Sequence, residues 1–317
     1  MIDVLSIDGG GIRGLIPALV LRHIEEQTGR PTADLFDLIA GTSTGGILAL
    51  GLTIPEEGAA VESEEASPRY SAEALASLYR ERGGDIFDRS RWQRVTSVFG
   101  LADEKYDHAG LVSVLEEYFG DEPIGQAVTD VMVSAYDIQA REPFFFMNWR
   151  APDDTVPMRR VARATTAAPT YFEPARVSVG SRQRVLVDGG VFANNPAVSA
   201  YAEARRQYPD EDIRVVSIGT GTSTEPIPYD EGQEWGKLGW AVETIDIVFD
   251  GVSDAADYQL RHILGDRFER FQGPLEAAAD AMDDASPENV EALARDAERL
   301  MEVRREELAA VVDRLAA

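Results

Sequence analysis

Residues Phe36–Leu50 are Phe-Asp-Leu-Ile-Ala-Gly-Thr-Ser-Thr-Gly-Gly-Ile-Leu-Ala-Leu. Apolar side chains run up to Gly41 and resume at Ile47, which predicts a strand, a tight turn and a helix. Ser43 lies in this turn within the pattern Gly-x-Ser-x-Gly, which ends at Gly45. Such a bend presents the serine hydroxyl at the end of a sheet, beside a helix N-terminus, and makes Ser43 a candidate nucleophile. The pattern also arises by chance, so an ordinary turn is the alternative.

A second glycine-rich turn, Gly9–Gly14, follows the short predicted strand Val4–Ile7 and precedes a predicted helix that ends at Gly29. Its pattern Gly-x-Gly-x-x-Gly matches the fingerprint of dinucleotide-binding folds. That fingerprint needs an acid at the end of the next strand, whereas Asp34 and Asp37 stand at its start. We therefore favour an oxyanion hole, in which glycine amides at a helix N-terminus face a developing negative charge. A plain structural turn is the third alternative.

Predicted strands alternate with predicted helices through most of the chain. This order predicts an α/β fold of three layers, α/β/α, with a mainly parallel central sheet whose ligands bind at the carboxyl ends of the strands. The further predicted strands cover residues 128–136, 144–149, 185–187 and 213–218, and the further predicted helices cover 111–118, 161–169 and 196–206. A helical region is expected from about 238 to 317. Without an internal repeat, we expect one domain, 1–317, with a core of about 1–225.

A nucleophilic serine needs a base, which is most often a histidine held by a carboxylate. The three histidines are His23, His108 and His262. None of them stands in a glycine-rich turn at a strand end, whereas Asp188 precedes Gly189 and Gly190 directly after the apolar residues 185–187. A carboxylate can act as the base itself if it reaches the hydroxyl with a suitable pKa. A turn aspartate without a catalytic role is the alternative.

Three motifs, in this order, resemble the signatures of patatin-like phospholipases: Asp8–Gly14, Gly41–Gly46 and Asp188–Gly190. The segments Ala162–Phe172 and Asn194–Pro196 also resemble those that flank the aspartate in that family. The resemblance is strong over about residues 1–225. It implies an α/β/α fold and a Ser-Asp dyad, with Ser43 as nucleophile and Asp188 as base. It also implies an oxyanion loop formed by Gly9, Gly10, Gly11 and Arg13, with motif support from Gly41, Gly45, Gly189 and Gly190.

The same resemblance implies a serine carboxylic ester hydrolase of the phospholipase A or lipid esterase type, with a lipid or other acyl ester as substrate. It implies no cofactor and no metal. Two alternatives remain open. One is an esterase with a Ser-His-Asp triad, and the other is a storage or interaction protein that keeps the fold with weak catalysis.

The composition bounds the partners and the location of the protein. The chain has 56 Asp and Glu against 30 Lys and Arg, a net charge of −26, and such a surface repels nucleic acid and anionic membranes at low salt. Only two of its basic residues are lysine, Lys105 and Lys237. Because the acid is spread along the chain and lysine is depleted, we favour adaptation to concentrated salt over an acidic interaction protein.

Cysteine is absent, which excludes disulfides and thiol chemistry. We see no signal peptide and no apolar run of the roughly 18 residues that a spanning helix needs, so we expect a cytoplasmic protein. Peripheral membrane contact is a further expectation. It would use an apolar rim formed by Ile86, Phe87, Trp92, Val98 and Phe99, for which ordinary core is the alternative.

Overall fold

The structure is a computed structural model that describes residues 1–58, 66–86, 109–224, 226–234 and 237–317. Within these ranges eight strands form one sheet in the order β5-β6-β3-β2-β1-β7-β8, with β4 paired to β3. The strands are β1 (Ile2–Ile7), β2 (Leu38–Thr42), β3 (Asp130–Asp137), β4 (Glu142–Met147), β5 (Ala175–Val179), β6 (Arg182–Asp188), β7 (Ile213–Ile218) and β8 (Phe268–Phe271).

The sheet is mixed. Strands β3, β2, β1, β7 and β8 run parallel to one another, while β4 and β6 pair antiparallel with β3, and β5 pairs antiparallel with β6. The predicted α/β fold class is confirmed. The antiparallel strands at one edge are an addition that the sequence pattern did not predict.

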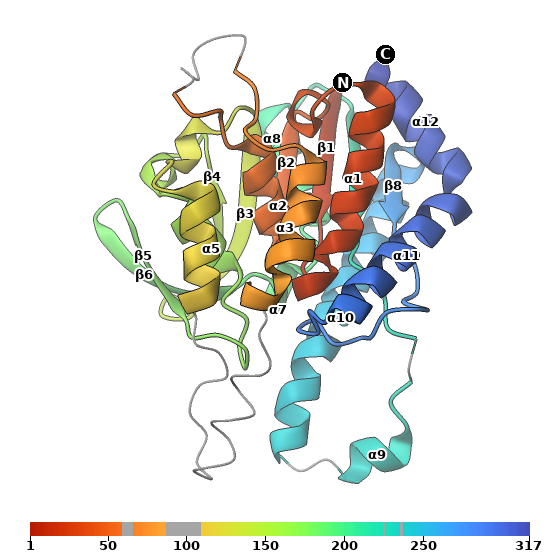
Figure 1. Cartoon of the computed structure of the whole chain (residues 1–317). Coiled ribbons are helices and arrows are strands. Elements are labelled where there is room, and N and C mark those ends of the chain that lie inside the picture. The colour runs from red at the N-terminus through yellow and green to blue at the C-terminus, as the bar shows by residue number, and fades with distance from the viewer. Residues whose placement is uncertain (59–65, 87–108, 225, 235–236) are drawn as a thin grey trace.

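Helices cover both faces of the sheet (Figure 1). They are α1 (Leu15–Thr28), α2 (Thr44–Thr53), α3 (Ala72–Ile86), α5 (Ala109–Phe119), α6 (Met158–Thr165), α7 (Gly190–Ala193), α8 (Ala197–Gln207), α9 (Tyr229–Glu234), α10 (Lys237–Leu264), α11 (Pro287–Val303) and α12 (Arg305–Ala316). Helices α1, α2, α3 and α5 lie in front of the sheet in Figure 1, and α8 lies behind it. Helix α9 and the first half of α10 project below the sheet.

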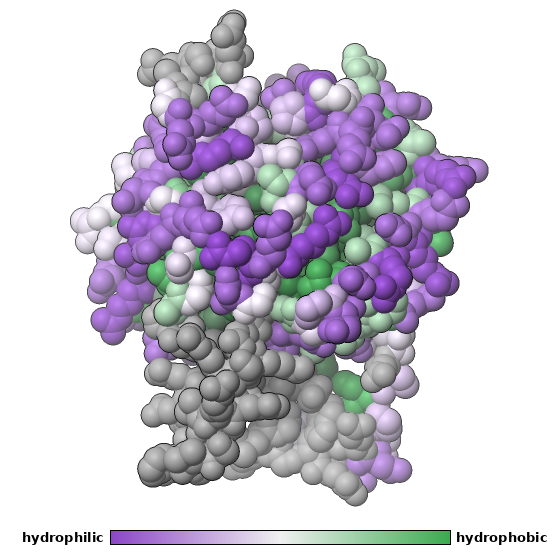
Figure 2. Space-filling model, viewed as in Figure 1, coloured by the Kyte–Doolittle hydropathy of each residue, from purple (hydrophilic) through white to green (hydrophobic). Residues whose placement is uncertain are grey.

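The central strand β1 is buried on both faces, as expected for a parallel strand between two helical layers. Leu5 and Ile7 pack into the larger apolar cluster with α1 and α2, whereas Ile2 and Val4 pack into a second cluster with α8. The alternation follows from the two-residue period of a strand. Polar side chains cover most of the outer surface seen in Figure 2, in keeping with the charge of −26.

The chain after 238, which was predicted to be mostly helical, also contains β8, which extends the sheet, and a loop that follows it. Two other predictions about elements need correction. Strand β5 falls in a stretch for which no strand was predicted, and helix α6 spans Met158–Thr165 and so ends before Pro169. The single-domain organisation stays a prediction. No helix in the described ranges has the length and apolar composition needed to span a bilayer.

Candidate active site

Ser43 occupies a strained turn between β2 and α2. Its φ of 54° and ψ of −121° are unusual for a residue with a side chain, and the surrounding structure must hold them. The Ser43 amide donates to Thr165 Oγ1 at 2.8 Å, and the Ser43 carbonyl accepts from the Ile47 amide at 3.1 Å. A Cβ on Gly41 would lie 2.1 Å from the Gly45 carbonyl oxygen, so the strand and the helix meet backbone to backbone.

The pairing register of β3 explains why Ser43 and Asp188 meet. Strand β4 pairs with β3 along Met132–Asp137, so β2 and β6 must share the other edge of β3. Strand β2 ends at Thr42, opposite Ser134, and β6 arrives from the other direction and ends opposite Ala135. The carboxyl ends of β2 and β6 therefore meet head-on, and the residues at these ends are Ser43 and Asp188.

The Asp188 carboxyl group is fully buried. Its Oδ1 accepts from the Gly190 amide at 2.7 Å, and its Oδ2 makes no hydrogen bond of standard geometry with the described residues. Burial raises the pKa of Asp188 to about 7, although the nearby Ser43 hydroxyl and the Gly190 amide both lower it. A carboxylate with this pKa, beside a serine hydroxyl, has the proton affinity expected of a general base at neutral pH.

The glycine turn after β1 faces the same site, but its backbone amides differ in whether they are already hydrogen-bonded. The Gly9 amide donates to the Asn194 carbonyl at 3.0 Å, so this donor of the predicted oxyanion loop is engaged in a backbone hydrogen bond. The amides of Gly10 and Gly11 have no partner among the described residues, and both glycines line the pocket beside Ser43. They are the remaining candidates for oxyanion donors.

Arg13 lies behind this turn, with 5% of its surface exposed. Its Nε donates to the Gly10 carbonyl at 3.4 Å, and its amide donates to the same oxygen at 3.1 Å. Because the C=O and N–H of a trans peptide point in opposite directions, fixing the Gly10 carbonyl also fixes the direction of the Gly11 N–H. Arg13 therefore contributes to the turn by holding its backbone.

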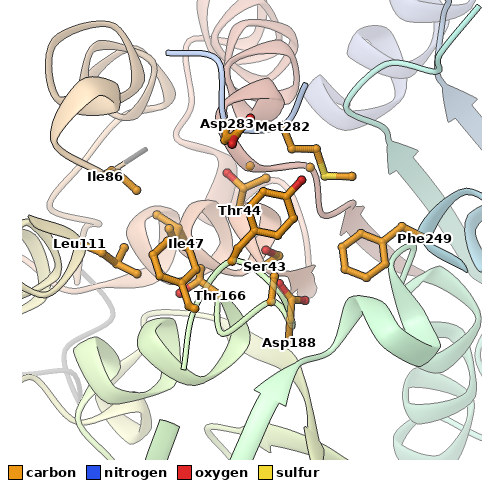
Figure 3. Close-up of a pocket in the computed structure, with 15 residues that line it drawn as sticks. Ser43, Thr44, Ile47, Ile86, Leu111, Thr166, Asp188, Phe249, Met282 and Asp283 are labelled. Atoms are coloured by element: carbon orange, nitrogen blue, oxygen red, sulfur yellow. The ribbon is translucent and has the colours of Figure 1, made fainter. Parts of the chain in front are cut away.

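Ser43 and Asp188 open into a pocket with mainly apolar walls (Figure 3). Phe249 of α10 lies on one side of the pair, and Ile47, Ile86 and Leu111 lie on the other. The remaining lining residues are Gly10, Gly11, Thr44, Thr166, Ala168, Tyr171, Phe172, Met282 and Asp283. Such a pocket suits an alkyl chain whose carbonyl group reaches the serine.

Neither of the two histidines within the described residues contributes to the site. His23 is half-buried on α1, and neither it nor His262 lines the pocket. The exposed His262 side chain is engaged on α10, where Nδ1 lies 2.7 Å from the Tyr258 carbonyl and the two rings stack. His108 lies outside the described residues. Within those residues no group of three or more His, Cys, Asp or Glu side chains could hold a metal ion.

The predicted apolar rim is only partly visible. Ile86 is 3% exposed and forms part of the pocket wall instead of a surface rim. Phe87, Trp92, Val98 and Phe99 lie outside the described residues.

The two glycines after Asp188 have a packing role. A Cβ added to Gly189 would lie 2.1 Å from Ser134 Oγ, and one added to Gly190 would lie 2.6 Å from Phe249 Cζ.

Several residues of the site were not foreseen. Thr165 holds the Ser43 amide, while Thr220 Oγ1 and Asn194 Nδ2 donate to the Gly9 carbonyl at 2.8 and 3.5 Å. Phe249 and Met282 come from the C-terminal region, which was expected to be mostly helical and was not connected with the site. The motif Asn194–Pro196 had drawn attention to Asn194, but no local pattern indicates that Phe249 or Met282 reaches the pocket.

Comparisons with known proteins show which family this chain is similar to. A family model described as patatin-like phospholipase matches residues 5–201. Patatin-04/09 of Solanum tuberosum is 32% identical, and patatin-like protein 2 of Oryza sativa subsp. indica is 30% identical; each alignment covers 95% of this chain and 84% of the relative. The crystal structure of VipD from Legionella pneumophila aligns with a TM-score of 0.43 at 10% identity, over 94% of this chain and 66% of that chain. The match to the family model over most of the chain, together with relatives of this identity and coverage, means that this protein belongs to the patatin-like phospholipase family.

Proposed function

We propose that the protein is a lipid acyl hydrolase, of the phospholipase A or lipid esterase type, that uses Ser43 as nucleophile and Asp188 as general base. The observation that carries the proposal is the Ser43 hydroxyl beside a buried carboxyl group with a pKa of about 7, facing an apolar pocket. The family supports the broader activity, and the contacts of the two residues support their roles.

The proposed reaction has two steps. Asp188 accepts the Ser43 proton while Oγ attacks the ester carbonyl carbon, and the resulting oxyanion accepts from the Gly10 and Gly11 amides. Collapse of this intermediate releases the alcohol, which takes up the proton from Asp188, and leaves Ser43 acylated. A water molecule then gives a proton to Asp188 and attacks the acyl group, and the fatty acid leaves as the proton returns to Ser43.

The pKa of Asp188 predicts a dependence of activity on pH. Only the ionised carboxylate can accept a proton, so kcat/KM should rise with pH and level off above about pH 7. A pH profile of p-nitrophenyl ester hydrolysis between pH 5 and 9, in molar salt, measures this. A profile that is flat across pH 7 would contradict the assignment of Asp188 as the base.

The apolar pocket predicts a preference for long acyl chains. Burial of one methylene group contributes about 0.8 kcal/mol, so kcat/KM should rise by up to about fourfold per added carbon until the pocket is filled. A series of p-nitrophenyl esters from acetate to dodecanoate, assayed below micelle-forming concentrations, tests this. Highest activity on the acetate would argue for a short-chain esterase.

The two alternatives give different outcomes. A Ser-His-Asp triad would make turnover depend on a histidine, so that His262→Ala or His108→Ala loses activity while Asp188→Asn keeps it. A storage or interaction protein would be inert towards every acyl ester at every salt concentration. Peripheral membrane contact stays a prediction, which vesicle flotation tests. Adaptation to concentrated salt also stays a prediction, which assays at several salt concentrations test.

A further inference from the structure

A buried ion pair stands at the start of the glycine turn. Asp8 directly precedes Gly9, and its carboxylate accepts from Arg270 of β8 through Nη1 to Oδ1 at 2.8 Å and Nη2 to Oδ2 at 2.6 Å. Asp8 is 1% exposed and Arg270 is 4% exposed. Arg270 Nη1 also donates to Ser217 Oγ at 2.8 Å, so the guanidinium group joins the carboxyl ends of β1 and β7.

Burial and the contact between the two side chains act in opposite directions on the charges of this pair. Burial lowers the pKa of Arg270, but the Asp8 carboxylate more than offsets this, and the pKa is raised overall. Burial raises the pKa of Asp8 overall, and the Arg270 guanidinium opposes this rise by stabilising the carboxylate. Removal of either partner would leave a charge buried without compensation.

The pair belongs to a set of contacts that hold the backbone on both sides of the Gly10 and Gly11 amides. On the first flank, the Asp8 amide donates to the Ile218 carbonyl at 3.1 Å. On the second flank, the Ile12 amide donates to the Met282 carbonyl at 2.9 Å. Between them the amides of Gly10 and Gly11 have no partner among the described residues. Arg270 and Met282 both lie outside the residues 5–201 that the family model matches.

A more exposed ion pair can also join β1 to β7, so the connection between these strands does not require a buried one. At the other ends of the same two strands, Arg214 donates to both carboxylate oxygens of Asp3 at 2.8 and 2.7 Å. Those side chains are 23% and 18% exposed, so their pairing costs less desolvation. The desolvated pair is instead found where the backbone turns into the pocket.

We propose that Arg270 is a positioning residue: through its two-pronged contact with Asp8 it fixes the start of the glycine turn. It thereby acts together with the contacts that hold the Gly9 and Gly10 carbonyls to align the Gly10 and Gly11 amides of the oxyanion hole. The proposal rests on the proposed function. The planar guanidinium fork matches both carboxylate oxygens, whereas a lysine ammonium keeps the charge but cannot make the same pair of parallel bonds. The substitution Arg270→Lys therefore separates orientation from charge.

Arg270→Lys should lower kcat about 10- to 100-fold while KM changes less than about threefold, because misaligned amides weaken binding of the oxyanion more than binding of the ester. The rate at which a fluorophosphonate probe modifies Ser43 should fall in parallel, since that reaction also develops charge on an oxygen in the same site. The matched control is Arg214→Lys, which removes the equivalent fork at the far ends of the same strands and should leave kcat within about twofold.

Circular dichroism and thermal melting check that each variant is folded. If Arg270→Lys does not fold, the double variant Asp8→Asn with Arg270→Gln removes both buried charges together and should show the same selective loss of kcat. Unchanged kcat and probe rate in a folded variant, with an active wild type, would overturn the positioning role alone. A wild type that is inert towards both esters and probe would overturn the proposed function, and the positioning role with it.

Discussion

Asp188→Asn should reduce kcat/KM for a long-chain p-nitrophenyl ester by a factor on the order of 10⁴ while the protein becomes more stable at pH 8. The loss follows because an amide cannot accept the Ser43 proton. Asparagine nevertheless keeps the shape of the side chain and the acceptor for the Gly190 amide, which bonds Asp188 Oδ1 at 2.7 Å. The fold around the site should therefore survive the substitution.

The gain in stability follows from the raised pKa. The Asp188 pKa is about 7 in the folded chain against 3.8 for an unperturbed carboxyl group, so the folded state binds the proton more tightly. The stability that this protonation contributes is fully present below about pH 3.8 and is lost as the pH rises through about 7. At pH 8 the carboxylate is ionised and buried, at a cost of up to about 4 kcal/mol that asparagine avoids.

Melting curves of the wild type and Asp188→Asn at pH 5 and pH 8 test the stability change beside the activity. The stability difference should be larger at pH 8. Ser43→Ala is the matched control. It should abolish turnover, but because it keeps Asp188, its difference in stability from the wild type should be about the same at pH 5 and pH 8. Full activity of Asp188→Asn would contradict the assigned base, and a large loss of stability at pH 8 would contradict the burial of an ionised carboxylate.

Gly41→Ala should destabilise the protein strongly and remove activity with it. The new methyl group would lie 2.1 Å from the carbonyl oxygen of Gly45 and 2.6 Å from the amide nitrogen of Gly46. These are backbone atoms at the start of α2, so they can only give way if the turn that carries Ser43 moves. Overpacking usually lowers the free energy of unfolding by about 1–3 kcal/mol. Because the clash here is with fixed backbone, we expect a loss at or above about 3 kcal/mol.

Gly84→Ala provides the matched control for this substitution. Gly84 is exposed on α3, and a Cβ there would meet no atom within 4 Å, so alanine should be neutral or stabilise the helix by up to about 1 kcal/mol. Thermal melting should show a fall of roughly 5–10 °C for Gly41→Ala and no fall for Gly84→Ala. A Gly41→Ala protein with the melting temperature and turnover of the wild type would contradict the close approach of β2 and α2.

Patterns among residues that are close in the sequence predicted most of the fold and of the candidate site. The strand, turn and helix around Ser43 follow from residues that are neighbours in the sequence, and β7 was predicted at Ile213–Ile218 as observed. The glycine-rich turn after the predicted strand at 185–187 also drew attention to Asp188. Asp188 was expected at the end of a strand in a mainly parallel sheet. Instead, β6 runs antiparallel to β3, and its end meets the end of β2 along the same edge of β3.

Features that depend on distant partners could not be predicted. Strand β8 is only four residues long, Phe-Glu-Arg-Phe, with two charged residues side by side in its middle. Arg270 is buried there beside Asp8, which lies 262 residues earlier and supplies its partner. Likewise, Gly9 resembles its neighbours in the sequence, but its amide bonds the Asn194 carbonyl, whereas the Gly10 and Gly11 amides have no partner in the part of the chain that the structure describes. Such assignments need the tertiary structure.

The most direct test of the Ser43–Asp188 account is to identify the covalent intermediate. The wild type is mixed with a long-chain p-nitrophenyl ester, quenched with acid during the first turnovers and digested for mass spectrometry. The account predicts that the peptide containing Ser43 gains the mass of the acyl group, and that this adduct is absent from Ser43→Ala. Hydrolysis that proceeds with the acyl group on another residue, or continues undiminished in Ser43→Ala, would contradict it.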